Sequence, residues 1–123
     1  MSNPKDRLRL IHRKIRYIQE ICQEDGSVTR ALADAKRSRA SILMHLTSIS
    51  EQFSRLSEDA EFEILAHFDK EDLRGSQDVR NYIAHDYEGV NLAIIESIIR
   101  TKLPKIKKVI EEILSVDSES DDP

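Results

Sequence analysis

The sequence predicts an all-α fold, an antiparallel bundle of four main helices with short helices between them. Its 123 residues suffice for one domain with a single core. The chain has only 3 Gly and 3 Pro, too few for the turns that a β-sandwich or barrel needs about every 8–12 residues. Its apolar residues recur at spacings of three and four, the period of a helix. A charged content of 34% is typical of helices with broad solvated faces.

The first helix is predicted to begin with Asn3 as its N-cap and Pro4 at the first helical position. One face then carries apolar residues at spacings of three and four, namely Leu8, Ile11, Ile15, Ile18 and Cys22. The pair Asp25-Gly26 is a typical stop signal, so we expect the helix to end there.

A heptad pattern four repeats long predicts the second helix, from Val28 to Leu56. The apolar positions alternate by four and three without a break, and Arg39 is the one charged residue among them. This pattern indicates either a long bundle helix or a helix that pairs with another chain.

Shorter helices are predicted in the middle of the chain. The tripeptide Ser57-Glu58-Asp59 has the composition of a cap with an acidic first turn, and a short helix through residues 62–66 follows it. Asp69 can cap a further helix that runs to about Asp86, with a weak point at Gly75.

The last part of the chain is predicted to form one or two helices. Gly89 marks a turn, and Asn91 can cap a helix through the apolar residues that follow. Pro104 ends or kinks that helix, or starts a last one. We expect a single helical domain over residues 1–114 and an acidic disordered tail over residues 115–123.

Charge is distributed unevenly along the chain. The net charge of −4 comes from the acidic tail, because residues 1–114 hold 19 bases and 19 acids. Residues 1–39 carry ten bases and five acids, which indicates either a local basic surface or ordinary solvated helix faces. The sequence has no signal segment, one cysteine and no apolar stretch of the ~20 residues that cross a bilayer. We therefore expect a cytoplasmic protein without membrane contact.

Few residues are candidates for chemistry. The sequence has no glycine-rich phosphate loop and no cysteine–histidine cluster with zinc spacing, and Cys22 is expected to be a core thiol. Of the four histidines, we expect His45 and His67 to be packing or surface residues. His12 and His85 are the two that are left.

Both of these histidines follow an arginine by five residues, as Arg7-x4-His12 and Arg80-x4-His85. With 11 arginines and 4 histidines in the chain, roughly 0.4 such matches are expected by chance, so the spacing alone carries little weight. The first pair lies inside a basic amphipathic helix, where nothing polar is expected to converge on it. The second lies at a predicted helix end, next to a hydroxyl, a carboxylate and a glycine turn.

Arg80 and His85 do not share one face of a regular helix. Five residues correspond to about 500°, which places the two side chains roughly 140° apart. Joint action therefore requires the long reach of arginine, a distortion at the helix end, or a second copy of the protein that completes the site.

The segment Arg80–Tyr87, with the form R-N-x3-A-H-x-Y, resembles the R-x4-H-x-Y motif of HepT-like toxins, which belong to the HEPN superfamily. The resemblance includes Asn81 directly after the arginine, a helix with Pro104 after the motif, and a long second helix with Glu51 near its end. In layout it covers most of residues 5–114. It implies the HEPN-like helical bundle.

Two positions depart from the family pattern. The family often has a glycine before the glutamate of the second helix, where this chain has Ser50. It also often has an aromatic residue before the motif, where the equivalent here is Leu73. These differences bear on Glu51, which the resemblance suggests as a supporting residue, and they leave the motif itself intact.

The resemblance implies a toxin that is a metal-independent ribonuclease, a homodimer whose two motif helices face each other across a cleft. Cleavage without a metal uses the 2′-OH of the RNA as nucleophile, and it needs a general base that titrates near neutrality and a fixed cation. His85 fits the first role and Arg80 the second, while Asn81 can orient a phosphate or the imidazole. The structural alternative is that Arg80 and His85 pair with neighbouring acids such as Asp78 or Asp86.

The resemblance also implies a means of control. In HepT-like systems a small MNT-type nucleotidyltransferase antitoxin attaches AMP to the motif tyrosine, here Tyr87, although this tyrosine can instead cap the core. RNA and the antitoxin are the expected partners, and we expect no cofactor, metal or DNA partner. A function of a different class stays open, a non-catalytic helical dimer that binds a nucleotide or a nucleotidyltransferase without cutting RNA.

Overall fold

The computed structural model describes residues 3–120 of the chain, with side chains as far as residue 115. Its helices are α1 (Pro4–Glu24), α2 (Val28–Ala33), α3 (Ser38–Glu58), α4 (Phe62–Leu65), α5 (Lys70–His85), α6 (Leu92–Ser97), the π-helical η1 (Ile98–Lys102) and α7 (Leu103–Ser120). Residues 3–120 contain no strand, so the predicted all-α fold is confirmed.

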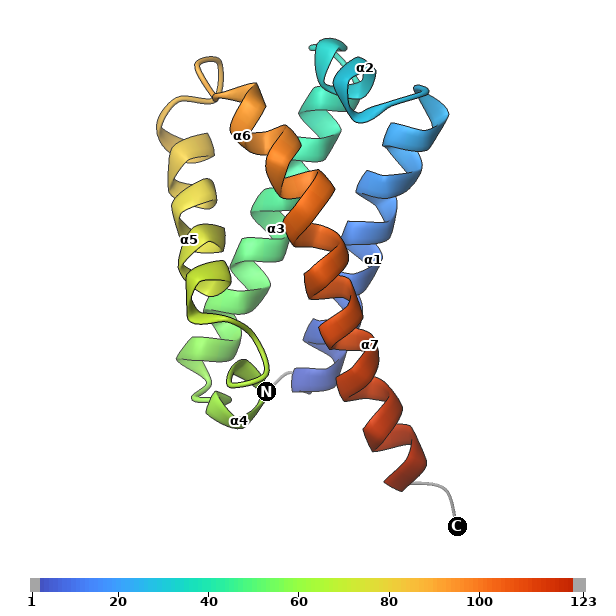
Figure 1. Ribbon diagram of the computed structural model, residues 1–123. Coiled ribbons are helices and arrows are strands. Elements are labelled where there is room, and N and C mark those ends of the chain that lie inside the picture. Colours follow the sequence, from blue (N-terminus) through green and yellow to red (C-terminus); the bar gives the residue numbers. More distant parts are fainter. Residues whose placement is uncertain (1–2, 121–123) are drawn as a thin grey trace.

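Four helical segments, α1, α3, α5 and the continuous α6–η1–α7, run alternately up and down (Figure 1). This is the predicted antiparallel bundle of four main helices, and α2 and α4 are its short helices. Helix α2 and the loop after α5 lie at the upper end of the view, and α4 lies at the lower end (Figure 1). Among the described residues, no helix is long and apolar enough to cross a membrane.

The signals at both ends of α1 act as predicted. Asn3 Oδ1 accepts a hydrogen bond from the Lys5 amide at 2.9 Å, and Pro4 occupies the first helical position. The helix ends at Glu24, before Asp25-Gly26. The apolar residues predicted to share one face are all buried, namely Leu8, Ile11, Ile15, Ile18 and Cys22. The pattern therefore identified the face of α1 that packs against α3 and α7.

The predicted unbroken helix from Val28 to Leu56 is wrong, because the chain leaves helical geometry after Ala33. Asp34 has φ −82° and ψ 86°, and its carboxylate accepts a hydrogen bond from the Arg37 amide at 3.2 Å. Such a bond offers the backbone an alternative to the helix. The apolar heptad positions within α3 are nevertheless buried, so the pattern located the core face correctly and missed the interruption.

Arg39 bridges the interruption, which explains the one charged position in the heptad pattern. Its Nε–H donates to the backbone carbonyl of Leu32 at 2.7 Å. This carbonyl lies at the end of α2, where helices leave acceptors without an amide partner. The guanidinium therefore caps α2 and ties it to the first turn of α3.

The cap expected at residues 57–59 is also wrong, because α3 continues to Glu58. Ala60 has φ 57°, the left-handed conformation that closes many helices. The Glu61 amide then bonds the Leu56 carbonyl at 3.0 Å. The short helix predicted next is present as α4.

Pro104 is the second residue of α7, so the predicted start of a last helix at this proline is confirmed, and the chain approaches it through a π-helical turn. Proline has no amide hydrogen, and its ring crowds the carbonyl four residues back. In η1 the Leu103 amide donates to the Ile98 carbonyl five residues back, a wider turn that relieves this crowding. Helices α6, η1 and α7 therefore form one continuous rod.

The end of the chain differs in part from the expectation. Helix α7 extends to Ser120, so residues 115–120, expected to be disordered, are helical. Residues 121–123 of the expected tail lie outside the described residues. The division of the chain at residue 114 stays a prediction.

A buried carboxylate joins α5 to the rod. The Asp72 side chain is only 4% exposed, and its oxygens lie 3.1 Å from Lys102 Nζ and 2.8 Å from Lys105 Nζ. Lys105 also pairs with Asp69, the N-cap of α5. Burial by itself raises the pKa of Asp72, but hydrogen bonds and charges from the two lysines outweigh it, and the pKa is lower than usual. The charged carboxylate therefore stabilises the fold.

We expect Asp72→Asn to lower the free energy of unfolding at pH 7 by about 2 kcal/mol, because the amide removes the charge that both lysines contact. Since folding lowers the pKa of Asp72, its contribution is complete above the unfolded pKa of about 3.9 and is lost as the pH falls below it. Urea unfolding at pH 7 and pH 3 measures both effects. Asp69→Asn, at a more exposed carboxylate, is the control with a smaller loss. If the free energies of unfolding of wild type and Asp72→Asn differ at pH 3 by as much as at pH 7, this account is contradicted.

Candidate active site

Helix α5 carries the motif, and two polar contacts fix its position on α3. Ser50 Oγ donates to the Ser76 carbonyl at 2.7 Å, and Ser76 Oγ donates to Ser50 Oγ at 2.9 Å. One turn further along α3, Ser54 Oγ donates to Gln77 Oε1 at 2.7 Å. Ser50 is buried, so this pair sets the register of the two antiparallel helices from inside their interface.

Arg80 lies one turn beyond Ser76 on α5 and is half-buried. No hydrogen bond or ion pair joins its guanidinium to another residue that the structure describes. Asn81, the next residue, is exposed. A guanidinium that is partly withdrawn from water and has no protein partner is available to an anion from outside the chain.

His85 is the last residue of α5 and is exposed. Within residues 3–120, neither Arg80 nor His85 forms the ion pair with Asp78 or Asp86 that the structural alternative requires. The Asp86 carboxylate is engaged elsewhere, because its Oδ1 accepts a hydrogen bond from the Gly89 amide at 3.0 Å. The imidazole therefore has no bonded partner among the described residues and is accessible to a molecule from outside the chain.

The turn after α5 presents Tyr87 to solvent. A Cβ atom on Gly89 would collide with the Asp86 carboxylate, so a larger residue there would displace this carboxylate from its hydrogen bond. Tyr87 lies between these two residues with 42% of its surface exposed. It is two positions from His85 in the chain.

Glu51, the expected supporting residue, is exposed on α3 beside Ser50. Because Ser50 meets Ser76, Glu51 lies level with the turn of α5 that precedes Arg80. Among the described residues, no hydrogen bond or ion pair links Glu51, Arg80 and His85 to one another. One chain therefore presents the motif side chains at the end of α5 without joining them into a bonded cluster.

The other R-x4-H pair is engaged within the fold, so the expectation that nothing polar converges on it is wrong. Arg7 Nη1 donates to Gln52 Oε1 at 3.0 Å, and Arg7 Nε lies 3.6 Å from Asp59. His12 Nε2 is 2.9 Å from Glu111. These partners come from the end of α3, the residue that follows it, and α7. The sequence neighbours of α1 could not reveal them.

The other histidines and the cysteine have the expected places. His45 packs on Tyr17, with ring centres 5.5 Å apart, and burial, followed by the charge of Lys14, lowers the pKa of His45. His67 is exposed. Burial raises the pKa of the Cys22 thiol, as expected in a core. No group of three or more His, Cys, Asp or Glu in the described part of the chain is placed to hold a metal ion.

Comparison with protein families gives one match over most of the chain. The model described as "Ribonuclease HepT-like" matches residues 11–113. The chain belongs to the HepT-like family. The resemblance seen at Arg80–Tyr87 is thereby confirmed, and the family description supports a ribonuclease activity in general. No curated protein and no solved structure matches the chain.

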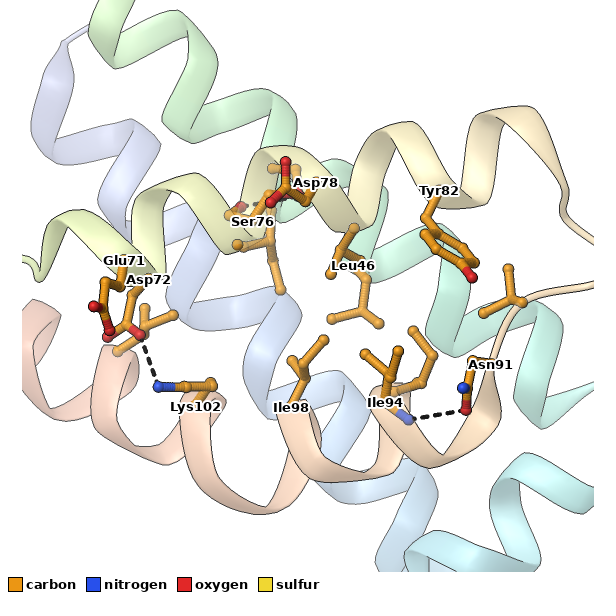
Figure 2. Close-up of a pocket in the computed structure, with 17 residues that line it drawn as sticks. Leu46, Glu71, Asp72, Ser76, Asp78, Tyr82, Asn91, Ile94, Ile98 and Lys102 are labelled. Atoms are coloured by element: carbon orange, nitrogen blue, oxygen red, sulfur yellow. Dashed lines mark hydrogen bonds and ion pairs between the residues drawn. The ribbon is translucent and has the colours of Figure 1, made fainter.

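An open cavity of about 460 Å³ in this HepT-like chain lies between α5, α3 and the α6–η1 segment. Figure 2 shows Tyr82 on α5 and Ile94 on α6 extending into the same gap, with Asp72 and Lys102 at its far end. Neither Arg80 nor His85 lines it. Helix α5 therefore carries Arg80 and His85 outside the lining of this largely apolar hollow.

Sequence reasoning missed the Ser50–Ser76 pair and the cavity of this HepT-like bundle. A serine inside the apolar stripe of α3 was a signal for the first, because a buried hydroxyl requires a hydrogen-bond partner. No local pattern could show the cavity, since its walls come from elements that are distant in the sequence.

Proposed function

We propose that this HepT-like protein is the toxin of a toxin–antitoxin system and cleaves RNA without a metal ion. The observation that carries the proposal is that the two basic side chains of the motif have no ionic partner among the described residues. Half-buried Arg80 and exposed His85 have no ionic partner among the described residues. Groups that act on a substrate must be left free of such partners. Membership of the family supports ribonuclease chemistry.

In the proposed reaction, the 2′ oxygen of the RNA attacks the adjacent phosphorus, and the bond from phosphorus to the 5′ oxygen breaks. His85 accepts the proton of the 2′-OH and returns a proton to the departing 5′ oxygen. The products are a 2′,3′-cyclic phosphate and a 5′-OH. Arg80 donates to the phosphate oxygens, where negative charge grows in the transition state. We assign supporting roles to Asn81, which orients a phosphate or the imidazole, and to Glu51.

A second copy of the chain completes the site in this proposal. Arg80 and His85 lie five residues apart on one helix, roughly 140° around its axis, and no hydrogen bond joins them in the described residues. In a two-fold homodimer, Arg80 of one copy acts with His85 of the other. Each dimer then holds two composite sites.

The proposed control is covalent and acts on Tyr87. A nucleotidyltransferase antitoxin transfers AMP from ATP to the Tyr87 hydroxyl, which forms a bond to the α-phosphorus while pyrophosphate leaves. The new phosphodiester is an anion two residues from His85, so it pairs with Arg80 as an RNA phosphate does. The adenosine adds bulk in the cleft. The 42% exposure of Tyr87 supports access by such an enzyme.

A non-catalytic dimer that binds a nucleotide or a nucleotidyltransferase is the second candidate. The cavity beside α5 favours it, because a largely apolar hollow of about 460 Å³ has the size of a small-molecule site. Incubation of purified protein with total RNA and tRNA in EDTA separates the two candidates. Cleavage supports the ribonuclease, and intact RNA together with nucleotide binding supports the non-catalytic dimer.

His85→Ala and Arg80→Ala should each lower the rate of RNA cleavage in EDTA by about 10²–10⁴-fold, because each removes a group that acts in the transition state. Circular dichroism should show an unchanged fold, since neither side chain has a partner among the described residues. His67→Ala and Arg55→Ala, at exposed residues of the same types, are matched controls that keep the rate. His12→Ala should also keep it. Loss with His12→Ala but not with His85→Ala, or a requirement for Mg²⁺, would refute the assignment.

A mixture of the two inactive variants tests the composite site. When Arg80→Ala and His85→Ala chains exchange subunits at equal concentration, half of the dimers are mixed, and each mixed dimer has one intact site. The mixture should therefore recover about a quarter of the wild-type rate. The control is each variant exchanged with itself, which should stay inactive. A mixture without activity would show that both residues must come from one chain.

Co-expression with a partner nucleotidyltransferase should add AMP to Tyr87 and abolish cleavage while the fold is kept. Mass spectrometry should find the increment on the peptide with Tyr87 and none on the peptides with Tyr17 or Tyr82. A fully inhibited but unmodified complex would mean that the antitoxin only covers the site. Tyr87→Phe is a weaker test, because the hydroxyl can also help to hold substrate.

A further inference from the structure

A tyrosine ring and a histidine ring pack together where α1 meets α3, with basic side chains beside them. The ring centres of Tyr17 and His45 are 5.5 Å apart, and Lys14 Nζ lies 5.8 Å from the centre of the Tyr17 ring. All three residues are half-buried, and the Tyr17 hydroxyl forms no hydrogen bond within the described residues. Part of this aromatic surface is therefore open to a molecule from outside the chain.

Positive charge beside this aromatic pair is left without an acidic partner. On the exposed side of α1, Arg9 and Arg16 each pair with an acid of the same helix. Arg13 lies between them, one turn before Tyr17, and is exposed. Within the described residues, neither Arg13 nor Lys14 forms an ion pair. These two cations and the aromatic pair together form the Tyr17 cluster.

The Tyr17 cluster has the composition of a site for single-stranded nucleic acid. In such sites an unpaired base stacks on an aromatic ring, and basic groups contact the neighbouring phosphates. Burial, followed by the charge of Lys14, lowers the pKa of His45, so its imidazole is neutral at pH 7. The positive charge of the cluster therefore comes from Arg13 and Lys14, which are free to contact phosphates.

The cluster lies at the height of Arg80, across α3. Figure 1 shows α3 between α5 and α1, and it packs against both. The contact of Ser50 with Ser76 aligns the antiparallel helices α3 and α5. From this contact, His45 is five residues back along α3 and Arg80 is four residues on along α5, so both lie at about the same height. Since packed helices are about 8–10 Å apart, at most about 20 Å separate the axes of α1 and α5.

The outward side of α3 connects the cluster with the motif. At one edge of α3, Ser54 contacts Gln77 of α5, and Arg80 follows Gln77 by about one turn. At the other edge, His45 meets α1. Met44 points outward between the two edges at this height and is 69% exposed. A strand bound at Arg80 can therefore continue over Met44 to the cluster without entering the core.

We propose that the Tyr17 cluster is a second RNA contact, which holds an unpaired nucleotide a few positions from the bond that is cleaved. The base stacks on Tyr17, and Arg13 and Lys14 donate to the neighbouring phosphates. This inference rests on the proposed ribonuclease, and it adds where the uncleaved part of the substrate is held and that this part is single-stranded. Because the cluster does not touch the reacting atoms, it contributes to KM and not to kcat.

Binding of a fluorescein-labelled RNA to the His85→Ala protein, followed by anisotropy, tests the contact without cleavage. Tyr17→Ala in this background should raise the Kd of a single-stranded RNA about 10-fold, whereas Tyr17→Phe should keep it, because phenylalanine offers the same stacking surface. Tyr17→Leu separates stacking from packing, since it fills the space beside His45 but should lose affinity as Tyr17→Ala does. Phe62→Ala, at an exposed aromatic residue of α4, is the matched control that keeps the Kd.

Salt dependence tests the two cations, and duplex RNA tests the need for an unpaired base. Lys14→Ala and Arg13→Ala should each reduce the slope of log Kd against log salt concentration by about 0.7, the value for one phosphate of a single strand. Lys108→Ala, at an exposed lysine of α7, is the control that keeps the slope. A duplex RNA should bind equally well with and without Tyr17→Ala, because paired bases do not stack on the ring.

Binding and cleavage are measured separately, so the two proposals fail separately. Affinity that depends on Tyr17 in a protein that cleaves no RNA would uphold the contact and refute the ribonuclease. Cleavage by wild type with KM and kcat unchanged in Tyr17→Ala would uphold the ribonuclease and overturn the contact. An equal loss of affinity with Phe62→Ala, or an equal loss on duplex RNA, would also overturn it.

Discussion

The contact of Ser50, buried on α3, with Ser76, half-buried on α5, is the constraint on which the position of the motif depends. Apolar packing alone is not directional, and two helices that share only apolar surfaces can settle in neighbouring registers. A slip by one turn moves a helix by about 5.4 Å along its axis, whereas a working site tolerates only about 0.5 Å. The hydroxyl pair selects one register, because any other leaves buried polar groups unpaired. The position of Arg80 and His85 relative to the rest of the bundle follows from it.

Helix α5 separates its structural residues from those left free. Asp72 and Ile83 point inward and hold the helix, the first through two lysines and the second through the core. Arg80 and His85 have no partner among the described residues. The R-x4-H pair of helix α1 is bonded within the fold instead. Arg7 contacts Gln52 and Asp59, and His12 contacts Glu111. The R-x4-H spacing therefore holds two side chains with partners in α1 and two side chains without described partners in α5.

Local signals predicted most of the fold. The caps at Asn3 and Asn91 and the buried faces of α1 and α3 follow from periodicity and side-chain chemistry, which act over a few residues. The same reasoning failed where a side chain acted across an interruption or between distant elements. The Asp34 carboxylate accepts a hydrogen bond from the Arg37 amide where the helix is interrupted, and Arg39 bridges the interruption by donating to the Leu32 carbonyl. The motif could be located from the sequence, whereas the contact of Ser50 and the cavity depend on tertiary packing.

The packing of α7 against α1 joins the last helix of the bundle to the first. The contacts of α1 with α3 and of α3 with α5 form between successive segments, so they can form early during folding. The contact of α1 with α7 spans nearly the whole chain and closes the core. During synthesis, a chain that has already exposed its motif still lacks this closing helix. The complete bundle, and any activity that depends on it, therefore exists only after α7 has left the ribosome.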